Sequence, residues 1–149
     1  MTAFLVFLAD YLTKYVAVKY LIEGPIYIFG DVFKLQLLFN TGAAFSLATS
    51  ATIFLSVFAM SAAAGIFYFA SRIDSNKWGL ALGLVLGGIF GNLSDRIFRE
   101  PGGLQGPVVD WISVLSWPTF NIADSGVVVG VLTIVWLIWS KTPSRSVSK

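Results

Sequence analysis

The sequence predicts an all-α membrane protein with four transmembrane helices and a small extracytoplasmic β-rich cradle. Hydrophobic residues make up 56% of the 149 residues and charged residues only 12%, about half the charged share of soluble domains. A soluble domain of this length would leave much of that apolar surface wet. One crossing takes about 20 apolar residues. Four stretches of spanning length are present, at residues 2–22, 51–70, 78–98 and 121–140, and we expect a single domain over residues 1–149.

The first stretch, residues 2–22, is expected to be a retained helix and not a signal peptide. It has no basic segment before it and no small-residue cleavage site after it. Asp10 and Lys14 lie four residues apart within it, with Thr13 adjacent, so the two charges share one helix face and can pair. Two interpretations of this pair remain: it fixes how the helix packs, or it takes part in catalysis.

The connection that follows, residues 23–50, contains two runs typical of β-strands. Aromatic and branched residues at 27–29 and 32–37 flank Gly30-Asp31, a dipeptide suited to a hairpin turn with glycine in its first place. We expect this apolar hairpin to lie against the outer bilayer surface or to shield a cleft.

The third stretch, residues 78–98, carries small residues at helical spacing. Gly83, Gly87 and Gly91 are four apart, with Gly88 beside them. This spacing lets helix backbones approach closely, an interpretation we prefer to a phosphate-binding loop.

Polar residues follow these glycines. Asn92 and Asp95 are three apart and share a face, and Arg96 is next to Asp95. An ion pair between Asp95 and Arg96 at the helix end explains both without catalysis. The alternative is that this group orients a carboxylate site.

The second connection, residues 99–120, contains helix-breaking Pro and Gly residues and then a strand-like run at 108–112. Asp110 lies alone within that apolar run. Asn121 and Asp124 begin the fourth stretch, where helix capping is one explanation. Asp124 lies about a turn inside the expected helix, and a cap would normally be placed earlier.

Basic residues favour a cytoplasmic position for both termini. The short loop and the tail on that side carry Arg72, Lys77, Lys141, Arg145 and Lys149. On the opposite side the basic residues are diluted by Glu23, Asp31, Glu100 and Asp110. The tail at residues 142–149 is expected to be disordered.

This topology brings several polar residues to one membrane surface. The first and third helices end outside and the fourth begins outside, so one outer site would collect Asn92, Asp95, Arg96, Asp110, Asn121 and Asp124, approached from below by Asp10 and Lys14. Helix packing alone does not require that co-location. We therefore predict a single polar site at the outer interface.

The composition limits the chemistry of such a site. The chain has no His and no Cys, which excludes Cys and Ser-His nucleophiles, imidazole or thiolate metal sites and disulfides. The net charge of +2 is too small to indicate nucleic acid. We expect no metal and no cofactor.

Paired carboxylates fit these limits. In a low-dielectric site one keeps its proton and the other acts as a base, an arrangement suited to hydrolysis. Asp110 and Asp124 are the candidate pair. Three other acids, Glu23, Asp31 and Glu100, lie in more polar settings and are expected to be solvated.

Five motif blocks together resemble the lipoprotein signal peptidases, also called signal peptidase II. They run in family order from Asp10 to Asp124: Asp10-Tyr11-Leu12-Thr13-Lys14, Asn40-Thr41-Gly42-Ala43-Ala44-Phe45, Gly87 to Arg96, Val108-Val109-Asp110-Trp111 and Phe120-Asn121-Ile122-Ala123-Asp124. Taken alone, the Asn40 block would be only a polar turn.

The resemblance implies an aspartic peptidase of the bacterial plasma membrane. It would remove signal peptides from prolipoproteins, cutting just before a Cys that carries diacylglycerol, and family members are inhibited by globomycin. The catalytic pair would be Asp110 and Asp124. Residues in the matching blocks would bind substrate or support the site: Asp10, Lys14, Asn40, Gly88, Asn92, Asp95, Arg96 and Asn121. The expected partners are these prolipoproteins and membrane lipids, and the expected state is a monomer.

Two departures from the family pattern are present. Trp111 stands where the family usually has Phe, which would alter the pocket wall, and the leader before Asp10 is shorter than usual. Neither touches the candidate pair.

Two other kinds of function compete with this one. In a proton or ion carrier, Asp10, Lys14, Asp95 and Asp124 would form a relay, but the fourth helix offers no ionisable residue between Asp124 and Lys141. In a structural membrane partner, the glycines would be the interface and the carboxylates would be idle.

Overall fold

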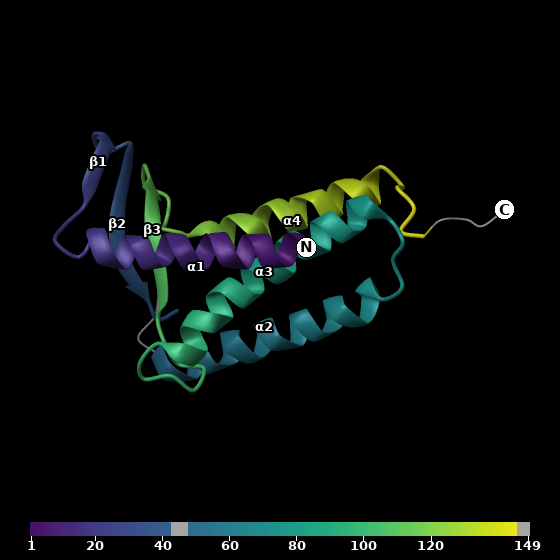
Figure 1. Cartoon of the computed structure of the whole chain (residues 1–149), viewed down its shortest axis with the longest axis horizontal. Helices are drawn as coiled ribbons and strands as arrows, with labels where there is room; N and C mark the ends of the chain where they lie inside the picture. Colours follow the sequence, from purple (N-terminus) through teal and green to yellow (C-terminus); the bar gives the residue numbers. More distant parts are fainter. Residues whose placement is uncertain (43–47, 146–149) are drawn as a thin grey trace.

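The computed structural model describes residues 1–42 and 48–145, in four helices and three strands. In chain order these are α1 (Thr2–Tyr20), β1 (Ile26–Phe29), β2 (Phe33–Asn40), α2 (Ala48–Ala70), α3 (Asn76–Phe98), β3 (Val108–Val114) and α4 (Ile122–Trp139). The helices run along the long axis of the molecule, and the three strands gather at one end (Figure 1). Each helix begins and ends within a few residues of a predicted stretch.

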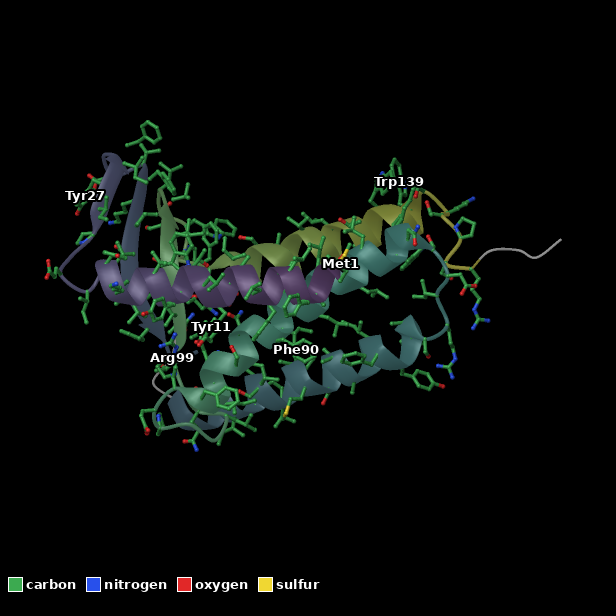
Figure 2. All side chains as sticks on the ribbon, viewed as in Figure 1. Met1, Tyr11, Tyr27, Phe90, Arg99 and Trp139 are labelled. Atoms are coloured by element: carbon green, nitrogen blue, oxygen red, sulfur yellow. The ribbon has the colours of Figure 1, made fainter. Side chains whose placement is uncertain are left out.

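Three helices are long and apolar enough to cross a membrane: α2 over Thr52–Ala70, α3 over Asn76–Phe98 and α4 over Ile122–Trp139. Their outer faces keep large apolar side chains exposed, among them Phe58 and Leu132. Figure 2 shows such side chains along the whole bundle, from Tyr27 at the sheet end to Trp139 at the other. The first helix, α1, carries three charged residues in its 19 residues, so its crossing of the membrane stays a prediction.

The central helix is α3, which packs against all three other helices. A Cβ added to Gly87 would lie 2.6 Å from the Ala3 carbonyl oxygen on α1, and one added to Gly88 would lie 2.6 Å from Val127 Cγ2 on α4. There is no room for a side chain at either contact, which confirms close helix packing at the glycines. Of the described elements, only α3 packs against α2, which lies apart from α1 and α4 in Figure 1.

The sheet is antiparallel, with strand order β1-β2-β3. The predicted hairpin is present: Gly30 has a φ of +55°, and the Val32 N–H donates to the Phe29 carbonyl at 3.1 Å. The strand-like run at 108–112 became β3, which extends the hairpin and places Asp110 opposite Leu38. The sheet packs on α1 and α3 at the same end of the bundle.

The prediction of a disordered tail is wrong for residues 142–145. The amides of Asp74 and Ser75 donate to the Ser144 carbonyl at 3.1 and 3.3 Å, and Trp78 Nε1 donates to the Thr142 carbonyl at 3.1 Å. The N-cap of α3, Ser75, makes no side-chain cap bond. The tail carbonyls therefore bind donors near a helix start that lacks its own cap. Residues 146–149 lie outside the described residues.

Candidate active site

The start of α4 is organised by Asn121 and Asp124. The Asp124 N–H donates to Asn121 Oδ1 at 2.9 Å, and the Asn121 N–H donates to Asp124 Oδ2 at 3.1 Å. This reciprocal arrangement is a capping box, with Asn121 as N-cap and Asp124 at the third helical position. The expectation that Asp124 lies too far inside the helix to cap it is wrong, because α4 begins only at Ile122. Capping uses one Asp124 oxygen and leaves the other to a different partner.

Asp110 is held by two amide side chains. Asn40 Nδ2 donates to its Oδ2 at 2.9 Å, and Asn121 Nδ2 donates to its Oδ1 at 2.7 Å. The three residues come from β2, β3 and the start of α4, which the sheet brings together. Asn121 thus touches both candidate carboxylates, one through its side chain and one through its backbone.

The environment of Asp110 changes its acidity. Burial raises the pKa of this carboxyl from the ordinary 3.8 to about 6, because the side chain is only 1% exposed and ionisation is poorly solvated there. The hydrogen bond from Asn40 lowers the pKa, and the charge of Asp124 raises it again. A carboxyl of this acidity exchanges its proton near neutral pH.

Asn92 on α3 connects the second carboxylate to the rest of the site. Its Nδ2 donates to Asp124 Oδ1 at 2.7 Å, and its Oδ1 accepts from Lys14 Nζ and Asn121 Nδ2, both at 3.1 Å. Both Asp124 oxygens are therefore occupied by donors. The position of Asp124 is fixed from two helices at once.

Lys14 is a buried cation between two acids. It pairs with Asp10 at 2.7 Å, as the spacing on α1 predicts, and with Asp95 on α3 at 2.9 Å. Asp10 also accepts a hydrogen bond from the Ala123 N–H at 2.8 Å. One carboxylate of α1 thereby binds an amide donor in the first turn of α4.

The partners of Asp95 differ from those predicted. It pairs with Lys14 and with Arg99 Nε at 2.5 Å. Of the two alternatives left open by the sequence, the ion pair between Asp95 and Arg96 is therefore wrong. Neighbouring residues on a helix point about 100° apart, whereas residues four apart share a face. Asp95 also accepts from the Val109 N–H at 3.1 Å, so it holds the backbone next to Asp110.

Arg96 is buried, and its Nη1 has no hydrogen-bond partner among the residues that the structure describes. The guanidinium lies beside Gly42, whose N–H donates to Asn40 Oδ1 at 2.8 Å. The predicted motif at 40–45 therefore contributes a turn that also positions Asn40. Its last three residues, 43–45, lie outside the described residues.

One network thus collects most of the predicted site residues. Hydrogen bonds and ion pairs connect Asp10, Lys14, Asn40, Asn92, Asp95, Asp110, Asn121 and Asp124. Gly88 lies apart from it and serves the contact between α3 and α4. Arg99 was missed as a site residue, although its spacing of four from Asp95 was a usable signal.

This arrangement suits acid–base chemistry without a metal. Two carboxylates flank Asn121, and one of them has a pKa of about 6. Within residues 1–42 and 48–145, no three acidic side chains come together in a group able to hold a metal ion.

The fold and the site define an integral membrane protein with a carboxylate site at one end of its helix bundle. Comparison with known proteins identifies the family. The chain belongs to the signal peptidase (SPase) II family, whose sequence profile matches residues 2–140.

Similar proteins agree with this assignment. A protein named lipoprotein signal peptidase from Rhodococcus jostii is 48% identical over 129 residues, which are 86% of this chain and 65% of that protein. One of the same name from Mycobacterium tuberculosis is 48% identical over 136 residues, 91% of this chain and 67% of that protein. The chain therefore spans about two thirds of the length of these relatives. A solved bacterial membrane enzyme superposes with a TM-score of 0.79 at 25% identity, covering 99% of this chain and 91% of that one.

Proposed function

We propose that the protein is a membrane aspartic endopeptidase that removes signal peptides from diacylglyceryl-modified prolipoproteins, cutting just before the lipidated Cys. Membership of the signal peptidase II family and the names of the relatives support the substrate class. The catalytic assignment depends on one observation, which is that Asp110 and Asp124 are both bound by Asn121.

The two carboxyls have different roles in hydrolysis. The ionised member takes a proton from water as the water oxygen attacks the scissile carbonyl carbon, while the protonated member donates a hydrogen bond to the developing oxyanion. The C–N bond then breaks, and the leaving nitrogen takes up a proton from the pair. The raised pKa of Asp110 supports a shared proton at this site.

The surrounding residues hold this pair in position. Asn40 and Asn121 orient Asp110, and Asn92 orients Asp124. The supporting charges are Asp10, Lys14 and Asp95, which bind the start of α4 and the backbone beside Asp110. Buried Arg96 next to Gly42 is a positive group for substrate binding. No cofactor or metal enters this mechanism.

The shape of the substrate fits a site at the end of a bundle. A signal peptide is an apolar helix and diacylglycerol has two acyl chains, so both would enter sideways from lipid and stop where water is available. We propose a monomer in the bacterial plasma membrane, with both termini cytoplasmic and the site near the extracytoplasmic surface.

Substitution of each carboxylate tests the assignment. Asp110→Asn and Asp124→Asn should each lower the cleavage rate at least about a hundredfold, the usual contribution of a general acid or base. The measurement is the release of signal peptide from a diacylglyceryl-modified preprotein in proteoliposomes. Asp31→Asn, which changes an exposed acid in the hairpin turn, is the matched control and should cleave normally.

Full cleavage by either variant would overturn the dyad. Loss of cleavage counts as support only if the purified variant unfolds at a temperature no lower than that of the parent or still binds globomycin. A carrier would instead move ions across liposomes, and we expect no ion flux from the parent protein.

A further inference from the structure

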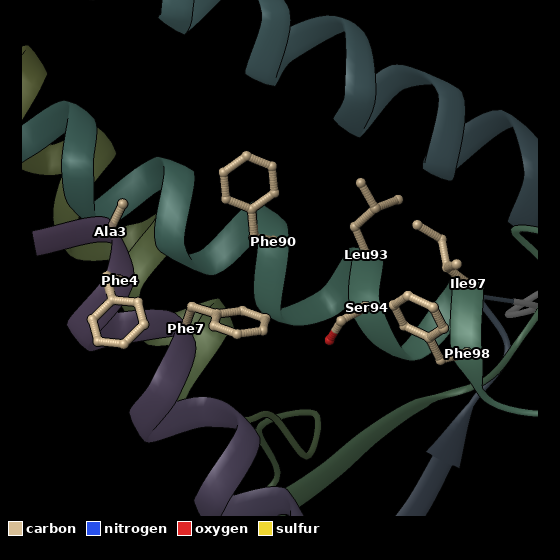
Figure 3. Close-up of a pocket in the computed structure, with 8 residues that line it drawn as sticks. All are labelled: Ala3, Phe4, Phe7, Phe90, Leu93, Ser94, Ile97 and Phe98. Atoms are coloured by element: carbon tan, nitrogen blue, oxygen red, sulfur yellow. The ribbon is translucent and has the colours of Figure 1, made fainter. Parts of the chain in front are cut away.

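An apolar groove runs along α3 on the side where α1 crosses it. It has a volume of about 450 Å³. Its walls are formed mainly by Phe4, Phe7, Phe90, Leu93, Ile97 and Phe98. In Figure 3 the first two extend from α1 and the others from α3. Among the residues that the structure describes, only those of α1 and α3 line the groove, and Phe4 and Phe98 are themselves exposed.

The groove is separate from the candidate active site. Phe90 lines the groove, whereas Asn92 binds Asp124. Residues two apart on a helix point about 200° from each other. The groove and the carboxylates therefore lie on opposite faces of α3, and a molecule in the groove does not contact the dyad.

A polar hollow continues the groove at the sheet end of the bundle. It is lined by Tyr11 and Tyr15 of α1 and by Asp95 and Arg99 of α3, and it shares Ser94 and Phe98 with the groove. The Asp95 carboxylate is paired with two cations, Lys14 and Arg99. The Arg99 side chain is 31% exposed. Its Nε binds Asp95, and a guanidinium has further N–H donors in a fork that matches phosphate oxygens.

The length of this combined surface matches one leaflet. Phe4 and Tyr15 are eleven residues apart on α1, or about 16 Å along a helix, which is half of a hydrocarbon core of about 30 Å. Tyr and Arg side chains are typical of the interface between hydrocarbon and headgroups. The polar hollow would then lie at headgroup level, and the groove would extend from it into the hydrocarbon core.

We propose that this surface binds one membrane phospholipid. An acyl chain lies in the groove between Phe7 and Phe90, and the phosphate is bound by Arg99 with the hydroxyls of Tyr11 and Tyr15 beside it. The bound lipid covers the apolar side chains of α1 and α3 that line the groove. This inference goes beyond the proposed peptidase activity and does not depend on it.

Photolabelling of the full chain in nanodiscs tests the acyl-chain position. The probe is phosphatidylglycerol with a diazirine in the middle of one acyl chain, and cross-linked residues are located by mass spectrometry. Labels should concentrate on the α1 and α3 peptides that contain Phe7 and Phe90, above the level on the equally apolar exposed face of α4. An equal level of labelling on all exposed apolar faces would overturn the proposal.

Two variants and a matched control measure the affinity. Ser94→Phe places a ring where the groove meets the polar hollow and should weaken binding of the probe about tenfold. Phe4→Ala removes part of an exposed wall without filling any space, so it keeps the test valid if Ser94→Phe does not fold. Val128→Phe adds the same ring to an exposed position on α4 and should bind as the parent does. Unchanged binding in both groove variants would overturn the proposal.

Two further measurements test the phosphate contact and distinguish a membrane phospholipid from the substrate's own lipid. Arg99→Gln should weaken phosphatidylglycerol binding and leave diacylglycerol binding unchanged, and an equal effect on both would overturn the phosphate contact. Unlabelled phospholipid should displace the probe. Displacement only by a diacylglyceryl-Cys peptide would show that the occupant is substrate and would overturn the proposal.

Discussion

Asp110 is a carboxyl that is almost fully buried, with two amide donors bound to its oxygens. Amide donors stabilise the ionised form, yet burial outweighs them and raises the pKa to about 6. The same burial that prepares the residue for proton transfer makes its charge costly for folding.

This cost predicts how stability changes with pH. The folded protein holds the Asp110 proton up to a pKa of about 6 and the unfolded chain only to 3.8, so the folded state is favoured at low pH. That advantage is lost as pH rises through 6, and ionisation then costs about 3 kcal/mol. The free energy of unfolding of Asp110→Asn, relative to the parent, should therefore rise by up to about 3 kcal/mol between pH 4 and pH 8.

Chemical unfolding of the purified protein in detergent at a series of pH values measures this difference. Asp31→Asn, an exposed change of the same kind, should show a difference from the parent that does not vary with pH over this range. A flat difference for Asp110→Asn as well would mean that burial does not raise the pKa of Asp110.

A second prediction for a single residue concerns the Lys14 ammonium. It is 2% exposed and pairs with Asp10 and Asp95. Lys14→Met therefore leaves the buried Asp10 carboxylate without its cation and leaves Asp95 with Arg99 alone. Breaking one side of a buried ion pair costs about 3–5 kcal/mol of unfolding free energy. Lys19→Met changes an exposed lysine on the same helix and should leave stability nearly unchanged.

Adding Asp10→Asn to Lys14→Met should recover part of that loss, because the carboxylate that lost its cation is then neutral. Equal unfolding midpoints for the Lys14 and Lys19 variants would contradict the structural role of this ion pair.

Among the elements, α3 shows how glycine sets the distance between helices. Gly88→Ala should destabilise the protein by about 1–3 kcal/mol, because the new methyl group would press on the α4 backbone at Ala123 and on Val127. Gly79→Ala on the same helix has open space around it and should stabilise the protein by about 0.5–1 kcal/mol. Thermal unfolding of both variants measures the contrast, and a stabilised Gly88→Ala would contradict the close contact.

Local sequence patterns were enough to predict most elements. The helices follow from long apolar runs, and the hairpin follows from Gly30-Asp31 between apolar strands. The pairing of β2 with β3 was not predicted, since it joins segments on either side of two helices. The ordered part of the tail was also not predicted, because its hydrogen bonds reach the loop before α3.

For the whole molecule, the clearest prediction concerns its orientation. The chain contains no Cys, so single cysteines report the side on which they lie. Asp31→Cys in the hairpin turn should react with a membrane-impermeant maleimide added to intact spheroplasts. Ser71→Cys, in the loop between α2 and α3, should react only after the membrane is opened. Labelling of both in intact spheroplasts would contradict the proposed topology.

Composition and spacing by themselves determined the class of this protein. Apolar runs indicated the membrane, the absence of His and Cys excluded imidazole and thiolate chemistry, and ordered motif blocks indicated the family that comparison then confirmed. The pair of Asp10 and Lys14 was also predictable, because four residues make about one helical turn.

The tertiary structure decided which residues meet across the chain. It paired Lys14 with Asp95, excluded the pair of Asp95 with Arg96, and placed Asn121 between the two candidate catalytic acids. Such contacts depend on how helices and strands pack, and on the direction in which each side chain leaves its backbone. Spacing along a single helix or strand does not contain that information, because the partners are far apart in the sequence.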